Sequence, residues 1–251
     1  MSLMSSYYQP STQNMPSNQQ QQQQQHQQQP TLLEYISELV SKRVSTIQYL
    51  SRTHQGNTHW FNTILLTRDD LEDLYSNTKM MKRSCNFYTL GVSLGNLLHI
   101  NNPTDYAKAL VQLLNEFEHH TADTSRQKMK NIFRKTKNKD ESSYLDSTGE
   151  YVHLVVPHVA YELDYFEIFF TLCDVLTEIY HKFLTDMEGS QSTQSYFELA
   201  LKSDGKLKKI FSMITKELDA LARNAIKDEL KLIDPLSFSN KVTPIDFDAI
   251  E

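Results

Sequence analysis

Two Glu-x-x-His pairs are the residues of this sequence whose types and spacing could do chemistry. Glu116 and His119 lie in the stretch LLNEFEHH, and Glu178 and His181 lie in the stretch TEIYHKFL. A Glu and a His three residues apart share one face of a helix. Helical carboxylate proteins hold two metal ions with such pairs from two helices and a glutamate from each of two others. A ferritin-like di-metal protein is therefore one alternative.

The direction in which the pairs point argues against a metal site. At about 100° per residue, the apolar stripe over 166–184 places Glu178 and His181 on the outer side of their helix. The same construction over 103–121 turns Glu116 and His119 outward. Because ligands in a bundle core should lie within the apolar stripe, we expect no metal and no cofactor, and the di-metal protein stays a second alternative.

A run of basic residues is the next candidate. The stretch RQKMKNIFRKTKNK contains no acid, and its basic residues are Arg126, Lys128, Lys130, Arg134, Lys135, Lys137 and Lys139. Each basic residue near anionic headgroups adds about 1 kcal/mol of attraction to a membrane. An acidic stretch follows at once, so a solvated loop is the simpler interpretation. The net charge of −6 argues against nucleic acid as the partner, because binding phosphates needs a basic face.

The only tryptophan, Trp60, stands beside Phe61 in the apolar run HWFNTILL. Burial in the core is the simpler interpretation, because large aromatic side chains dominate core packing. A hot spot for a protein partner is the alternative.

The remaining reactive residue types do not form a recognisable site. His54 and His59 flank one turn and His153 and His158 another, without a cysteine or carboxylate at a spacing that completes a zinc site. Two cysteines, Cys85 and Cys173, lie far apart, which favours reduced thiols. Neither a phosphate-binding glycine loop nor a nucleophile elbow is present. We therefore expect no catalytic residues and a protein that is not an enzyme.

The elements that must position these residues are predicted to be helices. Pro30, Pro103 and Pro157 each open an apolar segment, and Pro235 and Pro244 follow the last one, which is where helices tolerate proline. Six glycines are too few for the turns of an all-β fold. The apolar spacing predicts an all-α bundle of about five to seven helices, over residues 31–53, 58–66, 67–82, 103–121, 157–187, 194–202 and 206–233.

Other segments are left open or predicted to be irregular. Residues 85–100 fit a helix or a loop with two glycines, and 151–156 fit a short strand or an extended lead-in. We expect a disordered glutamine-rich tail over 1–29, a single helical domain over 30–235 with an exposed charged loop at 122–150, and a flexible acidic tail over 236–251.

These features predict an interaction protein. Wide apolar arcs without a catalytic constellation favour a non-enzymatic helical adaptor or subunit of an intracellular complex, which acts through helix-mediated contacts with protein partners. The alternative is a peripheral binder of anionic membranes or nucleic acid through residues 126–139. We expect a cytoplasmic location, with the nucleus as the alternative, because no stretch of about 20 apolar residues is present.

Overall fold

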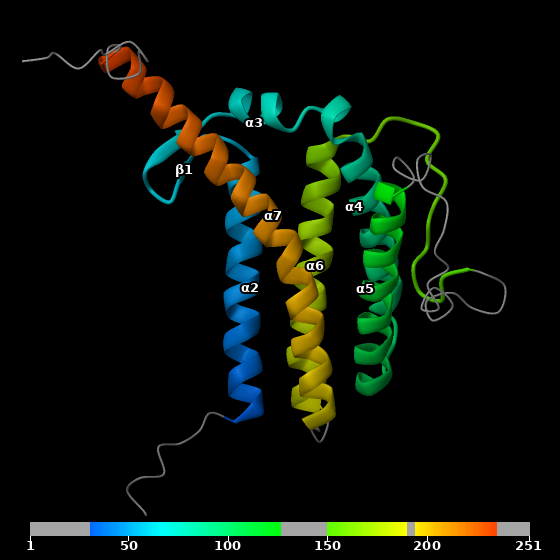
Figure 1. The fold of residues 1–251 in the computed structure, drawn as a ribbon. Coiled ribbons are helices and arrows are strands. Elements are labelled where there is room, and N and C mark those ends of the chain that lie inside the picture. The colour runs from blue at the N-terminus through cyan, green and yellow to red at the C-terminus, as the bar shows by residue number, and fades with distance from the viewer. Residues whose placement is uncertain (1–30, 127–149, 190–193, 235–251) are drawn as a thin grey trace, which may run out of the picture. The chain divides into compact units, whose positions relative to one another are not determined.

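The computed structural model describes residues 31–126, 150–189 and 194–234. Within them it is all-α, as predicted, with six helices and one small hairpin (Figure 1). The helices are α2 (Leu32–His54), α3 (Arg68–Leu74), α4 (Asn77–Leu97), α5 (Pro103–Arg126), α6 (Tyr165–Gly189) and α7 (Gln194–Ile233). By its contacts the chain divides into Met1–Thr31 and Leu32–Glu251, and all of these elements lie in the second unit. The predicted tails over 1–29 and 236–251 and most of the predicted loop, 127–149, lie outside the described residues.

Helix α6 is the centre of the packing, as its wide apolar arc predicts. It lies between α2 and α4, while α5 packs against α4 and α7, and α7 also crosses α2 and the hairpin (Figure 1). The buried side chains form one hydrophobic cluster to which every long helix contributes, for example Ile36, Leu90, Leu110, Tyr180 and Leu207. No helix among the described residues is both long and apolar enough to cross a bilayer.

The predicted helix over 58–66 is wrong, because this stretch forms a β-hairpin. Strands β1 (Thr58–Trp60) and β2 (Ile64–Leu66) pair antiparallel. Three non-glycine residues at its turns have positive φ, namely Asn57, Phe61 and Asn62, a conformation that a right-handed helix excludes. Gly56 has φ +86°, and a Cβ there would lie 2.9 Å from the Cα atom of Arg68.

The next boundaries follow local capping chemistry. Thr67 caps α3 as predicted, because its hydroxyl accepts the N–H of Asp70 and the Asp70 carboxylate accepts the N–H of Thr67. The prediction of one helix over 67–82 is wrong, because α3 ends at Leu74 and α4 begins at Asn77. The ambiguous residues 85–100 are helical almost throughout, since α4 continues past Gly91 to Leu97. Helix α5 begins at Pro103 as predicted and continues to Arg126.

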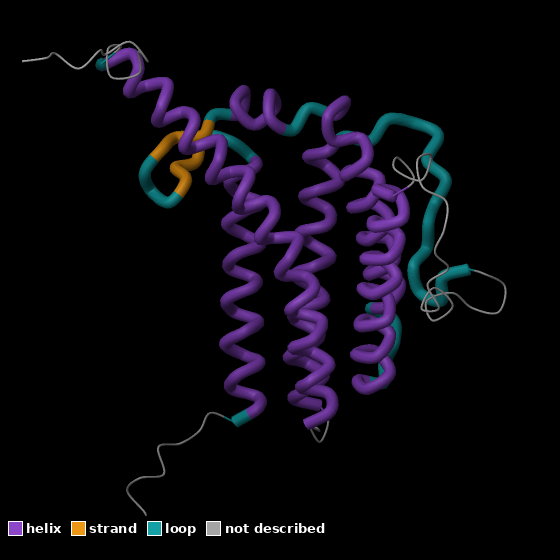
Figure 2. The backbone as a smooth tube through the Cα atoms, viewed as in Figure 1, coloured by secondary structure: helices purple, strands orange, loops and turns teal. Residues whose placement is uncertain are grey.

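Two predicted boundaries in the second half are wrong. Helix α6 begins at Tyr165 and not at Pro157, because the Asp164 carboxylate accepts the N–H of Glu167 and so caps the helix there. Residues 150–164, here called the strap, have almost no regular secondary structure (Figure 2). The strap contacts α5 at Glu116 and α4 at Ser93. The predicted break before Lys206 is absent: α7 is continuous through Gly205, because tertiary contacts on both sides of that glycine outweigh its low helix propensity.

Buried polar contacts attach α7 to the other helices. The Asp204 carboxylate accepts two hydrogen bonds from the Arg43 guanidinium of α2, at 2.6 and 2.9 Å, and a third from the Tyr180 hydroxyl of α6. Strand β1 of the hairpin is also attached to α7, since the Trp60 indole N–H donates to the Asp219 carboxylate at 2.7 Å.

Candidate functional site

The Glu-x-x-His pair of α6 points away from the core. Glu178 and His181 are both exposed, which agrees with their predicted direction. Among the residues that the structure describes, no three His, Cys, Asp or Glu side chains are grouped so that they could hold a metal ion.

The pair of α5 has a different environment from the one predicted. Glu116 is completely buried, and its carboxylate accepts the backbone N–H groups of Val152, His153 and Leu154 at 3.3, 2.9 and 2.8 Å. The prediction that Glu116 faces solvent from the outer side of α5 is wrong, because the strap covers that side. Its neighbour His119 lies with Nδ1 3.1 Å from the Tyr151 hydroxyl. Both residues therefore hold the strap.

Replacing Glu116 with alanine is expected to release the strap. Three strap N–H groups would lose their acceptor, and of these the Leu154 N–H is buried. A buried donor left without a partner costs about 1–3 kcal/mol. We expect amide exchange at Val152–Leu154 to accelerate at least about tenfold and the midpoint of thermal unfolding to fall. The matched control is Glu178→Ala on the exposed face of α6, which should change neither. Equal exchange rates in the two variants would contradict the assigned role of Glu116.

The two predicted interface aromatics lie in different surroundings. Trp60 is only 3% exposed, and its ring stacks on Tyr49 at a centroid distance of 5.3 Å. Phe61, at the tip of the hairpin, is 64% exposed. Of this pair only Phe61 offers its side chain to a partner.

The predicted basic site is almost entirely outside the described residues. Arg126 is the last residue of α5, while Lys128, Lys130, Arg134, Lys135, Lys137 and Lys139 lie in 127–149. Of the cysteines, Cys173 is buried, and burial raises the pKa of its thiol to about 12, so it stays protonated and is a poor nucleophile.

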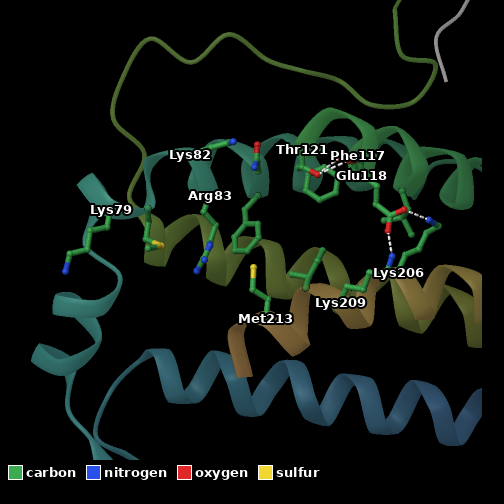
Figure 3. A pocket seen from close by; sticks show the side chains of 14 residues that line it. Lys79, Lys82, Arg83, Phe117, Glu118, Thr121, Lys206, Lys209 and Met213 are labelled. Carbon is green, nitrogen blue, oxygen red and sulfur yellow. Dashed lines mark hydrogen bonds and ion pairs between the residues drawn. The ribbon is translucent and has the colours of Figure 1, made fainter. Parts of the chain in front are cut away.

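A groove between α4, α5 and α7 brings together residues that no sequence motif connects. We call it the cationic groove; its volume is about 470 Å³. Its apolar lining comes from all three helices and consists of Met80, Phe87, Leu114, Phe117, Ile210 and Met213. Its basic lining consists of Lys79, Lys82, Arg83, Lys206 and Lys209, and its one acidic lining residue is Glu118 (Figure 3). The groove is therefore apolar with an excess of positive charge.

The charges of the groove differ in how firmly they are held. Arg83 is neutralised within the fold, because its guanidinium donates two hydrogen bonds to the Glu217 carboxylate, at 2.6 and 2.7 Å. Lys82 is exposed, and no ion pair within the described residues involves it. Lys79, also exposed, donates to the Asp73 carbonyl oxygen. The α4 side of the groove thus presents two lysines that pair with no carboxylate of residues 31–126, 150–189 and 194–234.

At the other end of the groove, Glu118 lies between two lysines of α7. Lys206 and Lys209 both donate to its carboxylate, the latter at 2.6 Å (Figure 3). Partial burial alone would raise the pKa of Glu118, but the hydrogen bonds from the two lysines outweigh it, so the pKa lies below its usual value. Glu118 is therefore ionised at neutral pH. It lies where the carboxylate of a bound ligand would also pair with Lys206 and Lys209.

The lining of the cationic groove is suited to binding a ligand rather than to catalysis. It couples an apolar surface, which gains free energy when an apolar side chain covers it, to lysines that attract carboxylates and exclude cationic partners. Met80 and Met213 are unbranched and adapt to ligands of different shape. An anionic, partly apolar ligand fits these properties.

Part of the groove was visible in the sequence. Lys79, Lys82 and Arg83 recur at spacing three and four, as do Lys206 and Lys209 at spacing three, so each set forms a basic stripe on a predicted helix. That two such stripes flank one apolar surface depends on the packing of α5 between α4 and α7, which no local pattern specifies.

Comparisons of the chain with protein-family models, with curated proteins and with solved structures find no match.

Proposed function

We propose that the protein is a non-enzymatic helical adaptor or subunit of an intracellular, cytoplasmic complex, and that the cationic groove binds an acidic, amphipathic segment of a partner protein. The observation that carries this proposal is the combination in one groove of an apolar lining from three helices with five basic side chains and one carboxylate.

Charge complementarity specifies the acidic character of the partner. Lys79 and Lys82 on one side and Lys209 on the other are exposed, so they attract a negatively charged segment during its approach and disfavour a basic one. Since surface ion pairs contribute only about 0–1 kcal/mol each, the charges select the partner and do not supply most of the affinity.

The apolar lining specifies the amphipathic character. Partly exposed Met213, at 38%, together with half-buried Phe117 and Ile210, leaves apolar area that a partner can cover. An amphipathic helix that lies in a groove between helices places side chains at positions i, i+3, i+4 and i+7 on such a surface. Covering it stabilises the complex by about 25 cal/mol per Å².

Reversing the charge of the groove is expected to abolish binding of such a segment. The probe is a fluorescein-labelled peptide with leucine or phenylalanine at helical spacing and aspartate or glutamate elsewhere. In the double variant Lys82→Glu/Lys209→Glu, both sides of the groove repel it, and we expect the Kd from fluorescence anisotropy to rise at least about tenfold.

The control uses the same helix and the same change in charge. Lys208 and Lys216 are exposed on α7 and do not line the groove, so Lys208→Glu/Lys216→Glu should bind the probe with the Kd of the unchanged protein. Equal weakening in both double variants would mean that only net charge matters and would refute the groove as the site. Binding to phosphatidylserine vesicles but not to the peptide, with the same dependence on Lys82 and Lys209, would replace the protein partner by a membrane surface.

A further inference from the structure

We infer that the chain carries its own ligand for the cationic groove: residues 244–251, with the sequence Pro-Ile-Asp-Phe-Asp-Ala-Ile-Glu, occupy the groove and compete with the partner. This inference rests on the proposed function, because it assigns an occupant to the same site.

The composition of this segment is complementary to the lining of the groove. It contains three apolar residues of the kind that the lining would cover, Ile245, Phe247 and Ile250, and three acids, Asp246, Asp248 and Glu251, without a basic residue. The groove offers the complement, with six apolar lining side chains and five basic ones. Carboxylates that alternate with apolar residues can face the lysines while the apolar side chains contact the lining.

The length of the connection allows the segment to reach the groove of the same chain. Helix α7 lines the groove from Lys206 to Met213 and ends at Ile233. At about 1.5 Å per residue, the path along α7 from Ile233 back to Met213 is about 30 Å. An extended chain from residue 234 to residue 245 spans up to about 36 Å. The segment can therefore lie in the groove without any change in α7.

Attachment to the same chain makes even a weak contact effective. A ligand tethered by a connection of about ten residues has an effective concentration in the millimolar range. If the isolated segment binds with a Kd of about 0.1–0.3 mM, the tethered segment occupies the groove most of the time, and an external partner must displace it. The expected consequence is autoinhibition that a stronger acidic partner overcomes.

The test compares full-length variants in the anisotropy assay with the same acidic peptide. In Ile245→Ala/Phe247→Ala the segment loses its apolar contacts, and we expect the probe to bind about three- to tenfold more tightly than it binds the unchanged chain. The matched control is Leu236→Ala/Phe238→Ala, which removes side chains of similar size from a stretch of the same tail that has no acids, and it should bind the probe like the unchanged chain.

The outcomes separate this inference from the proposed function. Equal, measurable affinity of the probe for all three proteins would overturn the self-ligand and leave the proposed function standing. No binding of the probe to any of the three proteins would refute the proposed function. In that case, a difference in the Met213 methyl chemical shift between the unchanged chain and Ile245→Ala/Phe247→Ala would still support occupancy of the groove by the segment. An affinity difference that disappears on dilution of the protein would show that the segment binds a second copy and would overturn the assignment to the same chain.

Discussion

Replacing Asp204 with alanine is expected to lower the free energy of unfolding by about 3–4 kcal/mol, as is typical when one partner of a buried ion pair is removed. Asp204 is 7% exposed and accepts three hydrogen bonds, two from Arg43 and one from Tyr180. These contacts join α7 to α2 and α6. Alanine would leave the Arg43 guanidinium, which is 12% exposed, and the fully buried Tyr180 hydroxyl without their acceptor.

Urea denaturation followed by circular dichroism measures this loss against a matched control. Asp228 also lies on α7, but its pair with Lys231 at 2.8 Å is exposed, so Asp228→Ala should change the free energy of unfolding by less than about 0.5 kcal/mol. Arg43→Met/Asp204→Leu removes both buried charges and should lower the free energy of unfolding less than Asp204→Ala alone, because no unpaired charge is left in the interior. Similar values for Asp204→Ala and Asp228→Ala would show that the buried pair does not anchor α7.

Acid is expected to destabilise the protein through His54. This side chain is fully buried and surrounded by aromatic rings, with the Phe169 ring centroid 4.1 Å away and that of Tyr75 5.0 Å away. Burial lowers its pKa from 6.5 to about 4, although the nearby Leu50 carbonyl oxygen acts in the opposite direction. The folded protein therefore holds His54 neutral, and the unfolded chain binds a proton more readily.

The direction of the pH dependence follows from this difference. The stability contributed by neutral His54 is fully present above pH 6.5 and is lost as the pH falls toward 4. The loss should be about 2 kcal/mol at pH 5 and about 3 kcal/mol at pH 4 relative to pH 7. Urea denaturation at these three pH values measures it. In His54→Leu, which does not titrate, this part of the pH dependence should disappear; a pH dependence identical to that of the unchanged protein would show that other groups cause it.

The fold could be predicted where local chemistry determines it. Pro103 opens a helix and Thr67 caps one because both act within a single turn, and the wide apolar arc of 166–184 identified the central helix. The predicted secondary structure is wrong where tertiary contacts determine the conformation. Apolar spacing favours a helix over 58–66, but this stretch forms a hairpin that packs against α7, where the Trp60 indole donates to Asp219.

The candidate site was harder to predict for a related reason. Glu116 was expected on an outer surface because rotation about a helix axis reports the direction of a side chain and not what covers it, and here the strap does. The cationic groove is lined by three helices, and the basic stripes of α4 and α7 meet only after these helices pack against α5. The spacing of Lys79, Lys82 and Arg83 indicates a basic face, but a single sequence does not show that Lys206 and Lys209 stand opposite to it.

The most direct test of the proposed function is to observe the cationic groove while a ligand binds. Methionine methyl groups labelled with ¹³C give separate resonances for Met80 and Met213, which line the groove, and for Met81, which is 57% exposed and does not line it. On titration with the acidic amphipathic peptide, we expect saturable shifts of the Met80 and Met213 resonances and a constant Met81 resonance. Shifts of Met81 alone, or no shift of any of the three at saturating peptide, would contradict the assignment of the groove as a docking site.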